Sequence, residues 1–207
     1  MTNSATDEVV RLVPFATPED VNQAVGAARE AWPAWRSTSP LRRARILMKA
    51  RDLIDKNRED LAKLLTSEHG KTLPDARGSI QRGLEVLEFS IGIPHLLKGE
   101  HSDNVGVGID SHTLKQPLGV CVGITPFNFP VMVPMWMVPV ALACGNTFVL
   151  KPSEKDPSPS ILLARLFQEA GLPDGVLNVI HGDKESVDAL LVHPDVAAVS
   201  FVGSTPV

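Results

Sequence analysis

The chain has 207 residues, of which 43% are hydrophobic and 21% charged, and its formal net charge is −4. This composition is ordinary for a soluble globular protein, and the length suits one large domain or a domain and a half. The negative balance argues against a general affinity for nucleic acid, which requires a basic surface. The longest apolar run, residues 131–144, is too short to cross a bilayer, which takes about 20 residues. We therefore expect neither a nucleic-acid nor a membrane partner.

Residues 17–98 have the apolar periodicity of helices. Thr17 before Pro18 predicts a capped helix start, since a hydroxyl can accept from the first free backbone N–H groups and proline suits the first turn. Glycine predicts a helix stop, because it readily adopts the left-handed conformation. The boundaries expected in this half are Thr17–Pro18 for a first start, Ser39–Pro40 for a second, Asn57 to Gly70 for a third helix, and about Pro74 to Leu97 for a fourth.

The second half alternates apolar strands with helices. Glycines near residue 100 and an alternating pattern predict a strand or hairpin over Val105–Leu114. Alternation of strand and helix then predicts a parallel sheet with right-handed crossovers. The expected strands are Val120–Ile124, Thr147–Leu150, Val176–Ile180 and Ala197–Val202, and the expected helices are Val131–Cys144, Pro157–Ala170 and Lys184–Val192. The fold class is thus α/β: a helical part (1–104), a small hairpin (105–116) and a Rossmann-like parallel sheet (117–207).

Polar residues follow the predicted strands, at the edge where parallel sheets bind ligands. Asn128 lies in a turn bracketed by Pro126 and Pro130, directly after the first strand of the sheet. An amide held among apolar side chains can be aimed at an oxyanion that develops during a reaction. The alternative is an asparagine that caps the following helix. Local sequence leaves both interpretations open.

The next strand ends in Lys151 and Glu154, which could donate to and accept from ribose hydroxyls. Glu154 also disfavours a 2′-phosphate, so NAD is preferred over NADP, although the neighbouring Lys155 weakens that inference. The last strand is followed by Gly203 and Ser204, which suit a pyrophosphate contact before a helix. The alternatives are a solvated charged loop and an ordinary turn.

Four side chains remain as candidates for other roles. Arg77 and Arg82, on the glycine-punctuated fourth helix, could grip a carboxylate in bidentate fashion or lie on the surface. Cys121 and Cys144 lie in apolar segments, and burial raises the pKa of a thiol, so we interpret both as core residues. Their spacing fits neither a metal site nor a disulfide, which indicates a reducing compartment.

No transit peptide is predicted in residues 1–10, and a cytoplasmic location is expected, or the mitochondrial matrix in a eukaryote.

Taken together, ordered motifs after residue 17 resemble the aldehyde dehydrogenase superfamily. The matching segments are Glu68-His69-Gly70-Lys71, Pro117-Leu118-Gly119-Val120, Pro126-Phe127-Asn128-Phe129-Pro130, Ala141-Leu142-Ala143-Cys144-Gly145-Asn146-Thr147, Lys151-Pro152-Ser153-Glu154, Gly171-Leu172-Pro173-Asp174-Gly175-Val176-Leu177-Asn178 and Phe201-Val202-Gly203-Ser204-Thr205.

The resemblance implies a role for each candidate. It makes Asn128 the oxyanion-hole residue, places Thr125 and Phe127 beside the nicotinamide, and assigns the adenosine ribose to Lys151 and Glu154. The same resemblance makes Ser204 a pyrophosphate contact and residues near 105–116 part of an oligomerisation sheet in a homodimer or homotetramer. It also implies that Lys155 keeps a charge where relatives often carry arginine, without its bidentate geometry.

Two runs resemble the CoA-acylating methylmalonate-semialdehyde dehydrogenase branch: residues 129–137 and Gly78-Ser79-Ile80-Gln81-Arg82-Gly83. That resemblance implies a small semialdehyde substrate whose carboxylate binds Arg82, with NAD as cofactor and CoA as acyl acceptor. The catalytic cysteine and glutamate of the family lie beyond residue 207, so the chain is expected to be an N-terminal part that is inactive and poorly soluble alone. Two alternatives remain: an NAD(P)-dependent dehydrogenase of another semialdehyde or aldehyde with water as acyl acceptor, and a non-catalytic, truncated nucleotide-binding module.

Overall fold

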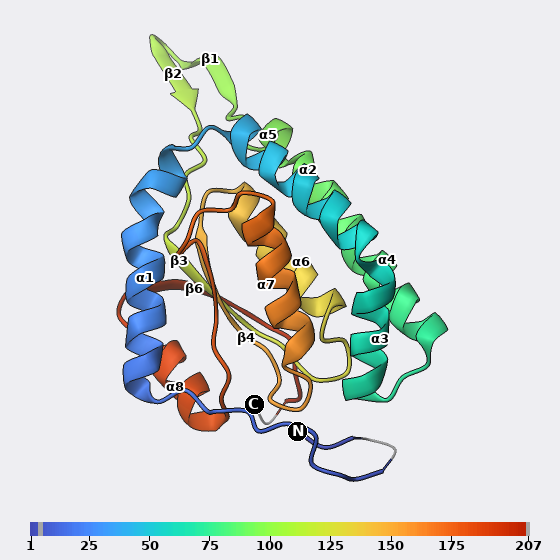
Figure 1. Cartoon of the computed structure of the whole chain (residues 1–207). Coiled ribbons are helices and arrows are strands. Elements are labelled where there is room, and N and C mark those ends of the chain that lie inside the picture. The colour runs from blue at the N-terminus through green and yellow to red at the C-terminus, as the bar shows by residue number, and fades with distance from the viewer. Residues whose placement is uncertain (4–5, 206–207) are drawn as a thin grey trace.

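A four-stranded parallel sheet forms the centre of the chain in the computed structural model, which describes residues 1–3 and 6–205. The strands are β3 (Val120–Ile124), β4 (Thr147–Lys151), β5 (Leu177–Val179) and β6 (Val196–Phe201), in the order β5-β4-β3-β6. They are connected by α6 (Met132–Ala143), α7 (Ser158–Glu169) and α8 (Lys184–Val192), as Figure 1 shows. The predicted α/β class is confirmed, and each predicted strand of the sheet is present within about two residues of its expected ends.

The two central strands are buried on both faces because helices cover the sheet from either side. Successive residues of a strand point to opposite faces. Val122 therefore packs with Val21 and Val25 of α1 (Pro18–Ser37), whereas Cys121 joins the larger core formed with α6, α7 and the helices before the sheet. In Figure 1, α1 and α8 lie on one side of the sheet and the remaining helices on the other. The near-continuous apolar sequence of β3 and β4 is a consequence of this double covering.

The register of the sheet brings the carboxyl ends of its strands to one level. Ile124, the last residue of β3, pairs with Lys151 on one side and with Phe201 on the other. The loops that follow β3, β4 and β6 therefore leave the sheet side by side. These are the loops that hold most of the polar candidates.

The helical part consists of α1 and of α2 (Pro40–Lys56), α3 (Arg58–His69), α4 (Leu73–Ile91) and the short α5 (Ile93–Leu96). The predicted start of α1 is confirmed by a capping box, in which Thr17 and Asp20 each accept from the other's backbone N–H group. Gly70 ends α3 in the left-handed conformation with φ 85°. No helix within the described residues combines the length and apolar character needed to cross a membrane.

Asn57 stands at the predicted start of α3, but its side chain makes no capping hydrogen bond there and donates instead to the carbonyl of Leu53 at the end of α2. Two other predicted boundaries of the helical part and hairpin are wrong. The fourth helix does not continue to Leu97, since it ends at Gly92 and α5 follows as a separate turn. The hairpin consists of β1 (His101–Gly106) and β2 (Ile109–His112), so it begins four residues before its predicted start.

Candidate functional site

The candidate site lies at the carboxyl ends of β3 and β4. The backbone N–H of Thr125 donates to the carbonyl oxygen of Lys151 at 3.2 Å, which extends the ladder by one bond and holds the two strand ends together. Residues 125–131 then form the turn into α6, and residues 152–157 lead into α7. The sequence prediction that both polar segments meet at one edge of the sheet is confirmed.

Thr125 and Phe127 present different surfaces to this edge. Thr125 is 3% exposed, and its Oγ1 has no hydrogen-bond partner among the described residues. Thr125 thus contributes a buried hydroxyl to this edge of the sheet. Phe127 is exposed, and the Nζ of Lys155 lies 4.4 Å from the centre of its ring. This cation–π contact connects the turn after β3 with the turn after β4.

Asn128 is exposed within its turn, so the expectation that apolar side chains shield its amide is wrong in this chain. The alternative role as a helix cap is also wrong, because α6 begins after Val131 and no side chain caps it. The backbone carbonyl of Asn128 accepts a hydrogen bond of 3.0 Å from the Nζ of Lys71. The side-chain amide of Asn128 is therefore exposed at the carboxyl edge of the sheet, while its backbone carbonyl is bonded to Lys71 of the helical part.

Lys151 and Glu154 form a half-buried polar pair and not a solvated loop. The lysine is 6% exposed, and its Nζ lies 3.6 Å from Oε2 of Glu154. Between them, the buried Oγ of Ser153 accepts a 3.2 Å hydrogen bond from the backbone N–H of Lys155, which tightens the turn. Lys151 and Glu154 thus extend from the same strand end, and the hydrogen bond of Ser153 restrains the turn that carries them.

The turn after β4 also carries a buried acid that the sequence did not reveal. Asp156 is 1% exposed, and burial together with the nearby carboxylates of Glu68 and Glu154 raises its pKa to about 8. Its Oδ1 has no hydrogen-bond partner in the described part of the chain. The aspartate directly follows Lys155 in sequence, but only the three-dimensional structure shows that it turns inward. A pocket of about 550 Å³ opens here, and its lining includes Phe127, Glu154, Asp156, Glu68 and His69.

His181 is a second residue that sequence reasoning left without a role. It follows β5, and its backbone carbonyl accepts from the N–H of Ala16 at 2.7 Å. Burial and the positive charge of Lys151 lower the pKa of its imidazole.

Gly203 and Ser204 are exposed beyond the end of β6. The N–H of Val202 donates to the carbonyl of Ile124 at 3.2 Å, so this segment leaves the sheet beside the turn of Asn128. The segments that follow β6 and β3 therefore start from neighbouring strand ends. Residues 206–207, which follow this segment, lie outside the described residues.

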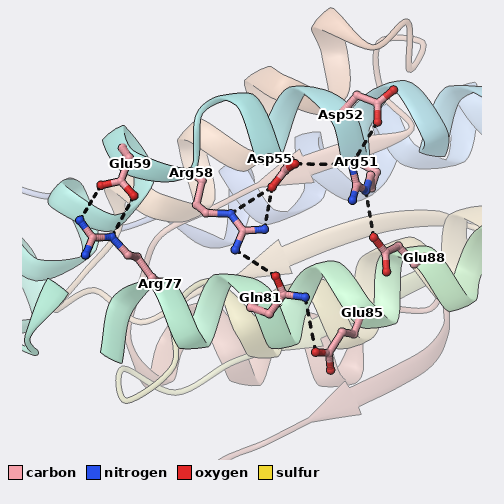
Figure 2. A network of polar contacts seen from close by, with 9 residues as sticks. All are labelled: Arg51, Asp52, Asp55, Arg58, Glu59, Arg77, Gln81, Glu85 and Glu88. Atoms are coloured by element: carbon pink, nitrogen blue, oxygen red, sulfur yellow. Dashed lines mark hydrogen bonds and ion pairs between the residues drawn. The ribbon is translucent and has the colours of Figure 1, made fainter. Parts of the chain in front are cut away.

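The two arginines of α4 have different surroundings. Arg77 forms a two-bond fork with Glu59, with both N–O distances at 2.8 Å, as Figure 2 shows. Arg82 is exposed and pairs with Glu85 one turn along the same helix. The structure connects α4 to the turn of Asn128 through Ser79, which accepts from Lys71, whereas the partner given for Arg82 within the described residues is Glu85.

Both cysteines are free, in agreement with their prediction as core residues. Burial raises the pKa of Cys121 to about 11. Burial also raises the pKa of Cys144, which caps the end of α6. Neither thiol has the acidity of an enzymatic nucleophile.

Comparison with known proteins identifies the family of this chain. The family model described as "Aldehyde dehydrogenase family" matches residues 1–207. The chain belongs to the aldehyde dehydrogenase family. It is 56% identical to malonate-semialdehyde dehydrogenase of Pseudomonas aeruginosa over 99% of the chain, and 55% identical to a probable methylmalonate-semialdehyde/malonate-semialdehyde dehydrogenase (acylating, mitochondrial) of Dictyostelium discoideum over 98%. The chain spans 41% and 38% of the lengths of these two relatives.

Solved aldehyde dehydrogenase structures agree with the fold. A methylmalonate-semialdehyde dehydrogenase from Oceanimonas doudoroffii matches 99% of the chain with a TM-score of 0.97 and 56% identity. A putative methylmalonate-semialdehyde dehydrogenase from Sinorhizobium meliloti, solved in complex with NAD, matches 99% with a TM-score of 0.96 and 58% identity. The chain covers 42% of each of these structures. The helices, the parallel sheet and the small antiparallel hairpin are therefore those of an aldehyde dehydrogenase.

Proposed function

We propose that this chain is the N-terminal, NAD-binding part of a CoA-acylating dehydrogenase that oxidises methylmalonate semialdehyde and malonate semialdehyde. The likeness to the NAD-complexed Sinorhizobium meliloti structure, at 58% identity over 99% of the chain, is the observation that carries this proposal. The names of the Pseudomonas and Dictyostelium relatives support the same substrates, and the word "acylating" in the latter name supports CoA as the acceptor. The chain alone is proposed to be inactive, because both of its thiols belong to the core.

The residues at the strand ends fit NAD. The unpartnered Oγ1 of Thr125 and the exposed ring of Phe127 would lie beside the nicotinamide half. Lys151 would donate to the adenosine ribose, and Glu154 would accept from it while opposing a 2′-phosphate. Gly203 and Ser204 would hold the pyrophosphate, and Lys155 would contribute a positive charge at the rim.

Two residues are proposed to act on the substrate. NAD supplies a hydride acceptor when it is bound. The amide of Asn128 would donate to the aldehyde oxygen as negative charge builds there, which stabilises the transition state more than the ground state. The guanidinium of Arg82 would bind the carboxylate of the semialdehyde, which requires it to leave Glu85. The nucleophile is expected from a part of the enzyme outside this sequence.

The hairpin β1–β2 is proposed to take part in a homodimer or homotetramer. Val105, Val107 and Ile109 are exposed on it, and Figure 1 shows that it extends away from the body of the chain. Exposed apolar side chains on a short two-stranded ribbon are typical of a surface that a partner covers. We place the enzyme in the bacterial cytoplasm or, as the name of the Dictyostelium relative states for that protein, in mitochondria.

Steady-state assays of the complete enzyme that carries this chain test the proposal. NADH formation from malonate semialdehyde and methylmalonate semialdehyde is expected to depend on CoA and to yield the corresponding acyl-CoA. NADP should be a poor substitute for NAD. Equal rates without CoA would show that water is the acyl acceptor, and a preference for aldehydes that lack a carboxylate would refute the proposed substrate class.

A further inference from the structure

One lysine of the helical part contacts the turn that carries Asn128. The Nζ of Lys71 donates to the backbone carbonyl of Asn128 at 3.0 Å and lies 4.5 Å from the centre of the Phe129 ring. The same ammonium donates to the Oγ of Ser79 on α4 at 3.4 Å. Three independent contacts of one charged group thus join a helix surface to two consecutive residues of the turn.

The backbone around Lys71 is fixed on both sides, so this side chain starts from a defined position. Gly70 ends α3 in the left-handed conformation, and its N–H donates to the carbonyl of Thr66 at 2.9 Å. Thr72 caps α4 by accepting from the N–H of Asp75. Between two capped helix ends only Lys71 remains, and its Ser79 partner is itself buried. The backbone of Lys71 is therefore held between α3 and α4, and its ammonium extends from there to Ser79 and to the turn.

Pro126 and Pro130 bracket the turn, and the carbonyl of Phe129 accepts from the N–H of Val133 at 3.1 Å, so Lys71 contacts the middle of a turn whose ends are restrained. Residues 125–131 contain no regular helix or strand, Asn128 and Phe129 are exposed, and α6 begins without a side-chain cap. A hydrogen bond to the Asn128 carbonyl fixes the peptide plane between Asn128 and Phe129. The cation over the Phe129 ring restrains the next side chain. Since the aim of an amide side chain follows its backbone, loss of both contacts would let the Asn128 amide move relative to the sheet edge.

We propose that Lys71 is a positioning residue, which holds the Asn128 turn so that the Asn128 amide points at the developing oxyanion. This inference rests on the proposed oxyanion role of Asn128. Burial lowers the pKa of Lys71, while the carboxylates of Asp75 and Asp156 raise it. Lys71 does not touch the reacting atoms, and its contribution is the geometry of the turn. Displacement of a reacting group by about 1 Å can cost on the order of 10²-fold in rate, so such a role is measurable.

The test is a double-mutant cycle in the complete enzyme, read as the single-turnover rate of NADH formation. Lys71→Met should slow this step by between about 10-fold and 10²-fold and leave the KM for NAD unchanged, and Lys71→Arg should recover part of the loss. The Asn128→Ala variant should be equally slow with and without Lys71→Met, because the amide to be positioned is absent. Lys63→Met, at an exposed lysine of α3 paired only loosely with Asp60 at 3.9 Å, is the matched control and should behave as wild type.

The outcomes separate the two proposals. A slow Asn128→Ala enzyme combined with a normal Lys71→Met enzyme would overturn the positioning role alone. So would a double variant slowed by the product of the two single effects. A normal Asn128→Ala enzyme would refute the oxyanion role itself. If Lys71→Met does not fold, Ser79→Ala, which removes one anchor of the ammonium, replaces it in the same cycle and should show a smaller loss that is again absent in the Asn128→Ala background.

Discussion

Polar side chains differ in their hydrogen-bond and ion-pair partners between the outer face of α2, α3 and α4 and the carboxyl edge of the sheet. On the helical face, Arg51, Arg58 and Arg77 each find carboxylate or amide partners in a network that Figure 2 shows in full. At the sheet edge, Thr125 and Asp156 are buried with oxygen atoms that have no partner among residues 1–3 and 6–205. Exposed ion pairs suit a solvated surface, whereas a buried carboxyl with a strongly raised pKa, such as Asp156, is more typical of a functional edge.

The largest effect expected at the sheet edge is on catalysis. Asn128→Ala in the complete enzyme should lower turnover by about 10²–10³-fold, because one oxyanion donor is lost. Steady-state kinetics under conditions where chemistry limits turnover check this. The matched control is Asn22→Ala, at an exposed asparagine of α1, which should leave turnover unchanged. Unchanged turnover in Asn128→Ala would contradict the functional contrast between the two regions.

Asp156 at the carboxyl edge of the sheet should also make the free energy of unfolding depend on pH. The folded-state pKa of Asp156 is raised to about 8, so the native state binds one proton more than the unfolded state between roughly pH 4 and pH 8. Stability should therefore fall as pH rises through this window, by about 1.4 kcal/mol per unit from this group. Urea titrations of Asp156→Asn across the window should show that this slope has disappeared. An identical slope in both proteins would mean that Asp156 is ionised at neutral pH.

A smaller effect is expected on the choice between NAD and NADP. Glu154→Gln removes the charge that opposes a 2′-phosphate and weakens acceptance from the ribose, so the affinity for NAD should fall by about 10-fold and that for NADP should rise. Binding titrations with both nucleotides measure this. Glu169→Gln at the exposed end of α7 serves as the control. A parallel loss for both nucleotides would place the carboxylate away from the 2′ position.

The smallest effect is expected on the helical face. Arg51 donates to Glu88 at 2.9 Å and lies 3.5 Å from Asp55, yet a third of its side chain is exposed. Exposed ion pairs contribute little, since solvent screens them and ordering two long side chains costs entropy. Arg51→Ala should therefore change the free energy of unfolding by less than about 1 kcal/mol. A loss of several kcal/mol in a urea titration would show that the network is a structural element.

The sequence predicted the sheet well because its signals are local. Strand β3 was located to the residue, and the start of α1 was found from Thr17 and Pro18, since burial pattern and capping chemistry are written in neighbouring residues. Asn57 stands at the start of α3 as predicted, but its side chain does not cap that helix, because two helix ends compete for it and its amide donates to Leu53. The choice between these partners depends on geometry that spacing does not contain.

The site was predicted only in part, for a similar reason. The motifs located Asn128, Lys151 and Glu154, and the register of the sheet confirms that their strands end side by side. They did not reveal the inward turn of Asp156 or the contact of Lys71 with a carbonyl 57 residues away. Both depend on how α3 and α4 pack against α7 and α6, and single-chain patterns carry no information on such distant contacts.

Calorimetric titration of NAD into the complete enzyme, its Lys151→Met variant and its Lys56→Met variant tests the central claim most directly. Lys151 is 6% exposed at the end of β4, whereas Lys56 is exposed at the end of α2 on the helical face. If the carboxyl edge of the sheet holds the cofactor, Lys151→Met should weaken NAD binding by about 10-fold to 10²-fold, because hydrogen bonds from a charged donor are lost. Lys56→Met should bind NAD as wild type does. Equal NAD affinity in all three proteins would contradict the account.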